Sequence, residues 1–260
     1  MNEARLQDVT LRYATSGEGP VALFLHGFPL DHGMWDGQRA GLADVRACVA
    51  PDLRGFGASC SLREETLTME QHARDAVALL DALGVEQADV VALSMGGYVA
   101  LALWELHPER VRSLALVDTR AEADDEAGRA KRDEAIERLL SDGREAFAAG
   151  MLGALVGPEA PAAARAAVRD MIEGTSYETI AAALRGMKVR ADRTALLESI
   201  SIPAMVVCGE HDVITPPALS EGMAARIPGA RLELVAGSGH MAPLEKPELV
   251  NDALRSFWVG

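Results

Sequence analysis

The sequence predicts an α/β fold built on a mostly parallel sheet, and two observations support this class. Short β-rich runs alternate with helical patterns as far as about residue 118, which is typical of right-handed βαβ units. The alternation then stops and resumes near residue 202, so a helical insert interrupts one sheet. With 260 residues, 49% of them hydrophobic, the chain is long enough for one large domain with a full core.

Five strands are expected before the insert. They are predicted at residues 5–14, 21–25, 45–50, 89–93 and 111–117. The last three are continuously apolar, as expected of strands that are covered on both faces. The helix predicted over residues 69–83 has apolar residues at helical spacing and stops at Gly84, a favourable C-terminal cap. A second helix, over residues 95–107, ends before Pro108.

The insert is rich in Ala, Arg, Glu and Met, and turn signals divide it into four or five predicted helices, the first over residues 126–141. The sheet pattern then returns. It comprises strands at 202–208 and 231–235 and helices at 217–227 and 248–258. We therefore predict three parts: the first part of the core at 1–119, a helical cap at 120–198 and the second part of the core at 199–260.

Charge and cysteine content narrow the functional classes. The net charge is −14, from 39 acidic and 25 basic residues, which argues against a nucleic-acid surface. The three cysteines, Cys48, Cys60 and Cys208, have no metal-binding spacing, and an odd number cannot all pair within one chain. The N-terminal residues do not resemble a signal peptide, and no apolar run approaches a membrane span. We expect a cytoplasmic protein without nucleic-acid or membrane partners.

Ser94 follows an apolar strand and precedes a helical segment in VVALSMGGY, residues 90–98. This order is typical of a nucleophile elbow, whose flanking residues must be small for the strand and helix to approach each other. Gly96 fits the usual G-x-S-x-G pattern, whereas Ala92 adds one methyl group. Serine is also a favoured helix N-cap, so the motif alone is compatible with an ordinary cap.

Further polar segments follow other predicted strands, where open parallel sheets place their chemistry. HGFPLDHGMW follows one strand, GEHD ends at Asp212, and GSGHM contains His240. The order Ser94, Asp212, His240 is the nucleophile, acid, base order of α/β-hydrolases. Asp118 also follows a strand and is the alternative acid, since strand-end geometry alone does not separate the two.

These blocks resemble those of α/β-hydrolases of the carboxylesterase and 3-oxoadipate enol-lactonase-like group, nearly from end to end. The matching segments are HGFPLDHGMW (26–35), PDLRGFGAS (51–59), LSMGGYVAL (93–101), LVDTR (116–120), GEHD (209–212) and GSGHMAPLEKPE (237–248). The resemblance implies the α/β-hydrolase fold: a mostly parallel eight-stranded sheet flanked by helices, with a helical cap after the sixth strand. It also implies a serine hydrolase, and it favours Asp212 over Asp118 because GEHD matches the family block.

The implied chemistry needs these residue types. Serine is a weak nucleophile, so His240 would take the proton of Ser94 while Asp212 orients and stabilises the imidazole. The oxyanion would be bound by two backbone N–H groups, that of Met95 after the nucleophile and that of Phe28 in the HGF loop. Such a reaction requires no metal and no organic cofactor.

The expected pocket is mainly apolar. Its predicted substrate-binding residues are Trp35, Tyr98, Met151, Leu155, Met187 and Met241. Such a wall suits a small uncharged ester. A carboxylated lactone would need a cation, for which the cap offers Arg185, Lys188, Arg190 and Arg193.

We therefore expect a carboxylesterase that acts on small short-chain esters through an acyl-serine intermediate. The alternatives are an enol-lactonase or a more general lactonase with the same triad, and a perhydrolase or cofactor-free haloperoxidase. A fourth hypothesis is a non-catalytic ligand receptor built on the same scaffold.

Overall fold

The computed structural model describes residues 1–60 and 62–259. The strands are β1 (Asn2–Arg5), β2 (Thr10–Ser16), β3 (Val21–Leu25), β4 (Ala47–Pro51), β5 (Ala88–Leu93), β6 (Val111–Val117), β7 (Ala204–Gly209) and β8 (Arg231–Val235). The α-helices are α1 (Asp36–Gly41), α2 (Met69–Ala82), α3 (Met95–Leu106), α4 (Glu126–Leu155), α5 (Ala162–Gly174), α6 (Tyr177–Lys188), α7 (Pro217–Arg226), α8 (Ala242–Glu245) and α9 (Pro247–Val259). Short 3-10 turns cover His32–Trp35 (η1), Pro108–Arg110 (η2) and Ala195–Ser199 (η3).

The strands form one sheet in the order β1-β2-β4-β3-β5-β6-β7-β8. The pairs β1–β2 and β2–β4 are antiparallel, and every pair from β4 to β8 is parallel. The predicted mostly parallel, eight-stranded sheet is therefore confirmed. The central strands β5 and β7 are buried along their whole length, which explains their continuous apolar sequences.

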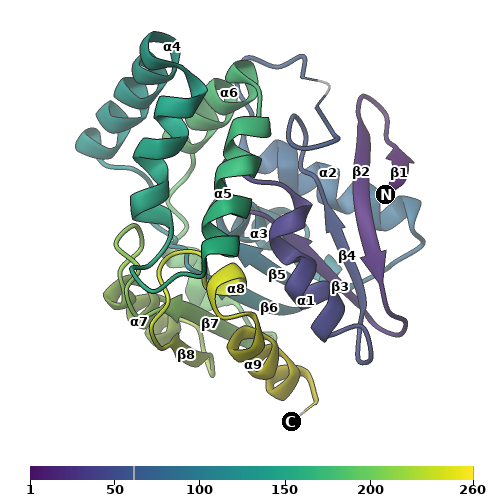
Figure 1. Cartoon of the computed structure of the whole chain (residues 1–260). Coiled ribbons are helices and arrows are strands. Elements are labelled where there is room, and N and C mark those ends of the chain that lie inside the picture. Colours follow the sequence, from purple (N-terminus) through teal and green to yellow (C-terminus); the bar gives the residue numbers. More distant parts are fainter. Residues whose placement is uncertain (61, 260) are drawn as a thin grey trace.

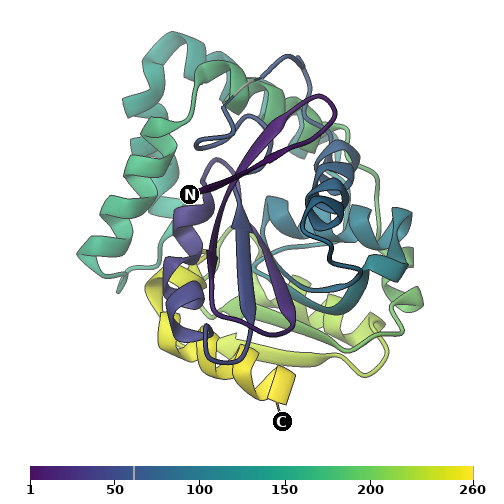
Figure 2. The ribbon, with the colours of Figure 1, turned by 90° about the vertical axis from the view of Figure 1, so that its right-hand side faces the viewer.

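Helices cover both faces of the sheet (Figures 1 and 2). One face carries α2, α3 and α7, and the other carries α1 and α9, with a hydrophobic core under each layer. The predicted end of α2 is confirmed, because Gly84 adopts φ +67° and its N–H donates to the Asp81 carbonyl at 3.0 Å. Because the strands from β4 to β8 run parallel, their carboxyl ends lie at one edge of the sheet.

Helices α4, α5 and α6 lie between β6 and β7 in the chain and cover that edge, at the top of Figure 1. Asp125 caps α4, its side chain accepting from the Gly128 N–H at 2.7 Å. Gly143 breaks α4 into two arms, since its φ of 86° and ψ of 170° are not helical. The insert thus has four helical arms, in line with the four or five predicted helices.

The first predicted strand, residues 5–14, is wrong as a single element. The chain turns within it, where the Leu6 N–H donates to the Val9 carbonyl at 2.8 Å, and the two sides pair as the antiparallel hairpin β1–β2. The polar pair Gln7 and Asp8 forms this turn and interrupts the apolar pattern. Among the helices of residues 1–60 and 62–259, none is both long and apolar enough to cross a membrane.

Candidate active site

Ser94 lies at the sharp turn between β5 and α3. Its φ of 52° and ψ of −114° are strained for a residue with a side chain, as in a nucleophile elbow. Gly96 is required by the tight approach of α3 to β3, because a Cβ there would clash with the Leu25 carbonyl. Ala92 is fully buried in β5, between Leu25 and Leu116 of its neighbour strands, so the sheet accommodates its methyl group.

The Ser94 hydroxyl makes no capping hydrogen bond, although the residue occupies the N-cap position of α3. Its backbone is held instead. The Ser94 N–H donates to the Val117 carbonyl at 3.0 Å, and the Thr119 hydroxyl donates to the Ser94 carbonyl at 2.7 Å. The turn is therefore fixed by β6 while the side chain remains available.

His240 and Asp212 meet beneath the cap, each from a loop that follows a strand. The Nδ1–H of His240 donates to Asp212 Oδ2 at 2.8 Å, and both side chains are buried. The Thr215 hydroxyl donates to the same oxygen at 2.6 Å. The other oxygen, Oδ1, accepts from the N–H groups of Ile214 at 2.8 Å and Thr215 at 2.9 Å. This arrangement fixes the imidazole and leaves its Nε2 for a reacting group.

The hydrogen bonds of Asp212 also fix its charge. Burial by itself raises the pKa of this carboxyl, but the hydrogen bond and charge of His240 and the bonds from Thr215 lower it more, to about 2. Asp212 is therefore ionised over the whole neutral range, which is the state that orients and stabilises an imidazolium.

Asp118, the alternative acid, does not contact the imidazole of His240 by a hydrogen bond. Its Oδ1 accepts from the Gly209 N–H at 2.7 Å, and its buried Oδ2 has no partner within the described residues. Burial raises its pKa well above the usual value, and the nearby charge of Asp212 raises it further. The ionised carboxylate that hydrogen-bonds to His240 is therefore that of Asp212.

Two backbone N–H groups near Ser94 are free to bind an oxyanion. Neither the Phe28 nor the Met95 N–H donates to an acceptor in the described part of the protein, and Met95 is the first residue of α3. The loop before Phe28 is fixed by His26, whose Nε2 accepts from the Leu53 N–H at 2.9 Å and whose Nδ1 donates to the Gly27 carbonyl at 2.9 Å.

Ser94 and His240 line one cavity of about 290 Å³ between the sheet edge and the cap. Five other predicted residues also line it: Phe28, Tyr98, Met151, Leu155 and Met187. Trp35 and Met241 do not. Trp35 is fully buried against the Phe24 ring, 5.3 Å away between centroids, and Met241 is fully buried in the same core. Both are therefore packing residues rather than wall residues.

The cavity wall is more charged than predicted. Arg120, Asp124, Lys131 and Arg132 line it, although the sequence singled out none of them. Of the cations considered from the sequence, Arg190 lies behind this wall, with its guanidinium 4.2 Å from the Tyr98 ring centre. The others form contacts elsewhere. Arg185 donates to the Glu65 carbonyl, Lys188 pairs with Asp133, and Arg193 pairs with Glu70 and Glu105.

Two clusters combine side chains of metal-ligand type, namely Asp31, His32 and Asp52, and Asp118, Cys208 and Asp212. In the first, Asp52 is occupied by His32, whose Nδ1 lies 2.6 Å from Oδ1. In the second, Asp212 is occupied by the bonds described above. Hydrogen bonds within the chain therefore account for the carboxylates of Asp52 and Asp212, whereas Asp118 Oδ2 has no partner among the described residues.

A sequence profile of the family described as alpha/beta hydrolase fold matches residues 20–247. The chain belongs to this family, and it is a hydrolase. The resemblance to its esterase and enol-lactonase-like members is likewise confirmed.

Individual relatives are similar over nearly the whole chain. 3-Oxoadipate enol-lactonase 2 of Acinetobacter baylyi is 29% identical over 255 residues, 96% of this chain and 93% of that protein. A thermophilic esterase from Thermogutta terrifontis, solved with malate bound, is 34% identical with a TM-score of 0.94, covering 99% and 98% of the two chains. The enol-lactonase of Burkholderia xenovorans LB400 is 26% identical with a TM-score of 0.90, covering 100% of both.

Proposed function

We propose that this protein is a serine carboxylesterase that hydrolyses small esters through an acyl-enzyme. One observation carries the proposal: the buried His240–Asp212 pair, joined at 2.8 Å, opens onto the same cavity as Ser94 on its strained turn. A nucleophile, a base and an ionised orienting acid are the groups that acyl transfer needs.

Acylation begins when Ser94 Oγ attacks the ester carbonyl and its proton passes to Nε2 of His240. The carbonyl oxygen becomes an oxyanion, which the N–H groups of Phe28 and Met95 stabilise. When the tetrahedral intermediate collapses, the C–O bond to the alcohol breaks and His240 returns its proton to the leaving oxygen. The products of this half-reaction are the free alcohol and an acyl-serine.

Deacylation repeats the sequence with water as nucleophile. His240 takes one proton from the water as its oxygen attacks the acyl carbon, and Ser94 leaves with that proton. The net reaction consumes one ester and one water and yields one carboxylic acid and one alcohol. The nucleophile, the base and the oxyanion donors in these steps all belong to this chain.

Lactone hydrolysis is the second candidate, favoured by the similarity to two enol-lactonases. The same attack by Ser94 would open the ring, with the alcohol remaining tethered to the acyl group. Specificity constants measured in parallel for open-chain methyl esters and for simple lactones of equal carbon number separate the two substrates.

The Ser94→Ala variant tests the proposal. We expect hydrolysis of 4-nitrophenyl acetate to fall by many orders of magnitude, with up to about a thousandfold catalysis over water remaining from the oxyanion hole and binding. A fluorophosphonate should label Ser94 stoichiometrically in the wild type only. Near-normal turnover by the variant would contradict the triad, whereas labelling without turnover of any ester or lactone would indicate a ligand receptor.

A further inference from the structure

Strand β8 is the last strand of the sheet, and its outer side has no partner strand within residues 1–60 and 62–259. All of its residues except the last, Val235, are exposed to solvent. They include two leucines, since Leu232 and Leu234 are 38% and 44% exposed. An exposed edge of this kind is a template on which a strand of another chain can pair.

The backbone of β8 leaves hydrogen-bonding groups free for such a strand. The Val235 carbonyl accepts from the Glu210 N–H at 3.0 Å, which fixes the peptide groups of Val235 on the β7 side. Because successive residues of a strand direct these groups to opposite sides, the N–H and C=O groups of Leu232 and Leu234 point away from β7. A second strand would form its ladder with these two residues.

The two edges of the sheet differ in how their charges are balanced. At the β1 edge, Glu3 pairs with Arg5 at 3.2 Å and with Arg12 at 2.7 Å. In β8, by contrast, neither Arg231 nor Glu233 forms an ion pair with any residue that the structure describes. The β8 edge therefore presents one positive and one negative charge that the chain itself does not pair.

These charges share one face of the strand. Arg231 donates to the carbonyl of Ser256 at 3.2 Å and to its hydroxyl at 3.1 Å, so Arg231 lies on the α9 side of the sheet. Side chains alternate along a strand, which puts Glu233 on the same side and the two leucines on the other. The edge is thus charged on one face and apolar on the other.

A second copy of β8 complements this pattern. In an antiparallel pair centred on Leu232, this residue lies opposite itself, and Arg231 lies opposite the partner's Glu233. Two-fold symmetry repeats the contact, so the pair contains two Arg–Glu contacts and keeps apolar side chains together. Centring the pair on Glu233 would instead oppose two like charges, and a shift by one residue would oppose charged and apolar side chains.

We infer that the protein forms a symmetric dimer through antiparallel pairing of two β8 strands, with Arg231 of each copy bound to Glu233 of the other. This interface goes beyond the proposed function and does not depend on it. Strand β8 is at the lower side of Figure 1, whereas the cap helices α4, α5 and α6 are at the top, so the interface lies apart from the cap.

Sedimentation equilibrium at micromolar protein concentration tests the dimer. We expect the wild type to sediment at twice the mass of one chain. Arg231→Glu and Glu233→Arg should each raise the dimer Kd by about tenfold or more, because each change brings two pairs of like charges together. Both side chains are exposed, so both variants should fold, which circular dichroism checks.

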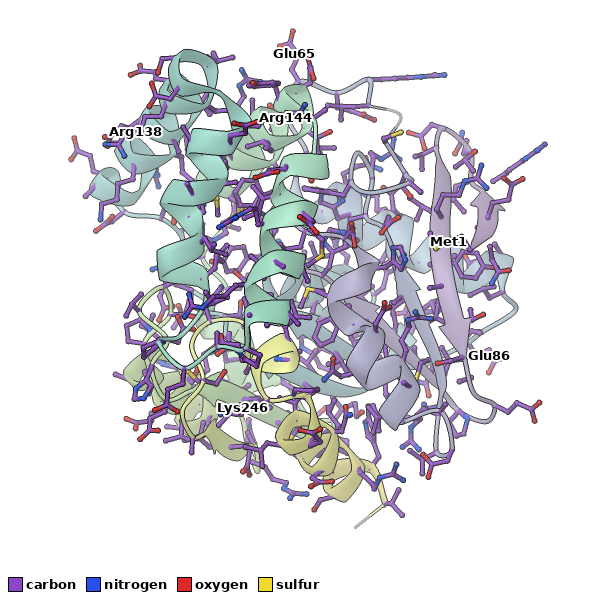
Figure 3. All side chains as sticks on the ribbon, in the orientation of Figure 1. Met1, Glu65, Glu86, Arg138, Arg144 and Lys246 are labelled. Atoms are coloured by element: carbon purple, nitrogen blue, oxygen red, sulfur yellow. The ribbon has the colours of Figure 1, made fainter. Side chains whose placement is uncertain are left out.

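Glu86→Arg is the matched control, because it makes the same change of charge as Glu233→Arg. Glu86 is exposed and lies on the opposite side of the molecule from β8 (Figures 1 and 3). The control should keep the wild-type Kd. A wild type that stays monomeric up to its highest soluble concentration, or an unchanged Kd in the two β8 variants, would overturn the inference.

Mixing the two single variants tests the register itself. In a mixed pair, the two glutamates of Arg231→Glu face the two arginines of Glu233→Arg, so we expect a heterodimer at concentrations where neither variant dimerises alone. The double variant Arg231→Glu/Glu233→Arg should likewise return to within a few-fold of the wild-type Kd. A mixture of the folded variants that stays monomeric would refute the pairing of Arg231 with Glu233.

Discussion

At the scale of single residues, two neighbouring buried carboxyl groups have opposite charge states. Asp118 and Asp212 have carboxylate oxygens within 4.8 Å of each other. The pKa of Asp212 is about 2, chiefly because His240 and Thr215 outweigh the effect of burial, whereas burial and the charge of Asp212 raise the pKa of Asp118. Two such groups cannot easily ionise together, so the one with more donors keeps the charge.

This difference predicts unequal effects of removing each carboxyl group. Asp212→Asn should lower kcat by about 10⁴-fold, because an amide neither fixes the productive tautomer nor stabilises the imidazolium. Asp118→Asn should keep kcat within a few-fold, since an amide oxygen can still accept from the Gly209 N–H. The two values of kcat are measured with 4-nitrophenyl acetate, and circular dichroism checks that both variants are folded. A comparable fall in kcat in the Asp212→Asn and Asp118→Asn variants would assign the acid role to Asp118 as well.

At the scale of elements, the Glu245 carboxylate ties the cap to the loop that carries His240. It accepts from the N–H groups of Gly157 at 3.0 Å, Gly239 at 3.1 Å and Met241 at 3.2 Å, and it is buried. Gly157 and Gly239 pack so closely that a Cβ on either would clash with the other's backbone. One side chain thus satisfies three buried donors at the point where the loop between α4 and α5 packs against the core.

Glu245→Ala should therefore destabilise the protein by about 3 kcal/mol, because three buried N–H groups lose their acceptor. We expect kcat to fall in parallel, since the same loop holds the imidazole. Urea unfolding at neutral pH gives the stability. Glu248→Ala, which changes an exposed glutamate in the first turn of α9, should stay within about 0.5 kcal/mol of wild type. Equal midpoints for the two variants would show that the donors find other acceptors.

The sequence predicts elements and strand-end residues better than the cavity wall. Periodicity places the central strands, and their carboxyl ends place Ser94 and the loops that carry Asp212 and His240, because a parallel sheet aligns those ends. Trp35 was expected in the wall because it is near the oxyanion loop in sequence, but its ring turns into the core. Arg120 lies in the loop after β6 and Arg132 lies on α4, and no local sequence pattern predicts that both line the cavity.

At the scale of the whole molecule, buried histidines make stability depend on pH. His72 is completely buried in α2, and neither ring nitrogen has a partner among the described residues. Burial, reinforced by the charges of His26 and Arg54, lowers its pKa from 6.5 to about 3. The folded protein therefore keeps His72 neutral under mildly acidic conditions in which an unfolded chain would protonate it.

The sign of the effect follows from proton linkage. Between pH 6.5 and about 3, the unfolded state binds a proton at His72 that the folded state does not, so stability falls as pH falls. One such group contributes about 1.4 kcal/mol per pH unit in this window. His72→Leu replaces the unpartnered ring by an apolar group and should remove this contribution, so its free energy of unfolding should decline less steeply.

Urea unfolding of the wild type and of His72→Leu at several pH values from 7 to 4 measures the two slopes. We expect the wild type to lose about 3 kcal/mol more than the variant between pH 6.5 and 4, whatever their difference at pH 7. Other titrating groups cancel in the comparison, because both proteins contain them. Parallel curves for the wild type and His72→Leu would mean that the folded protein protonates His72 as readily as the unfolded chain does.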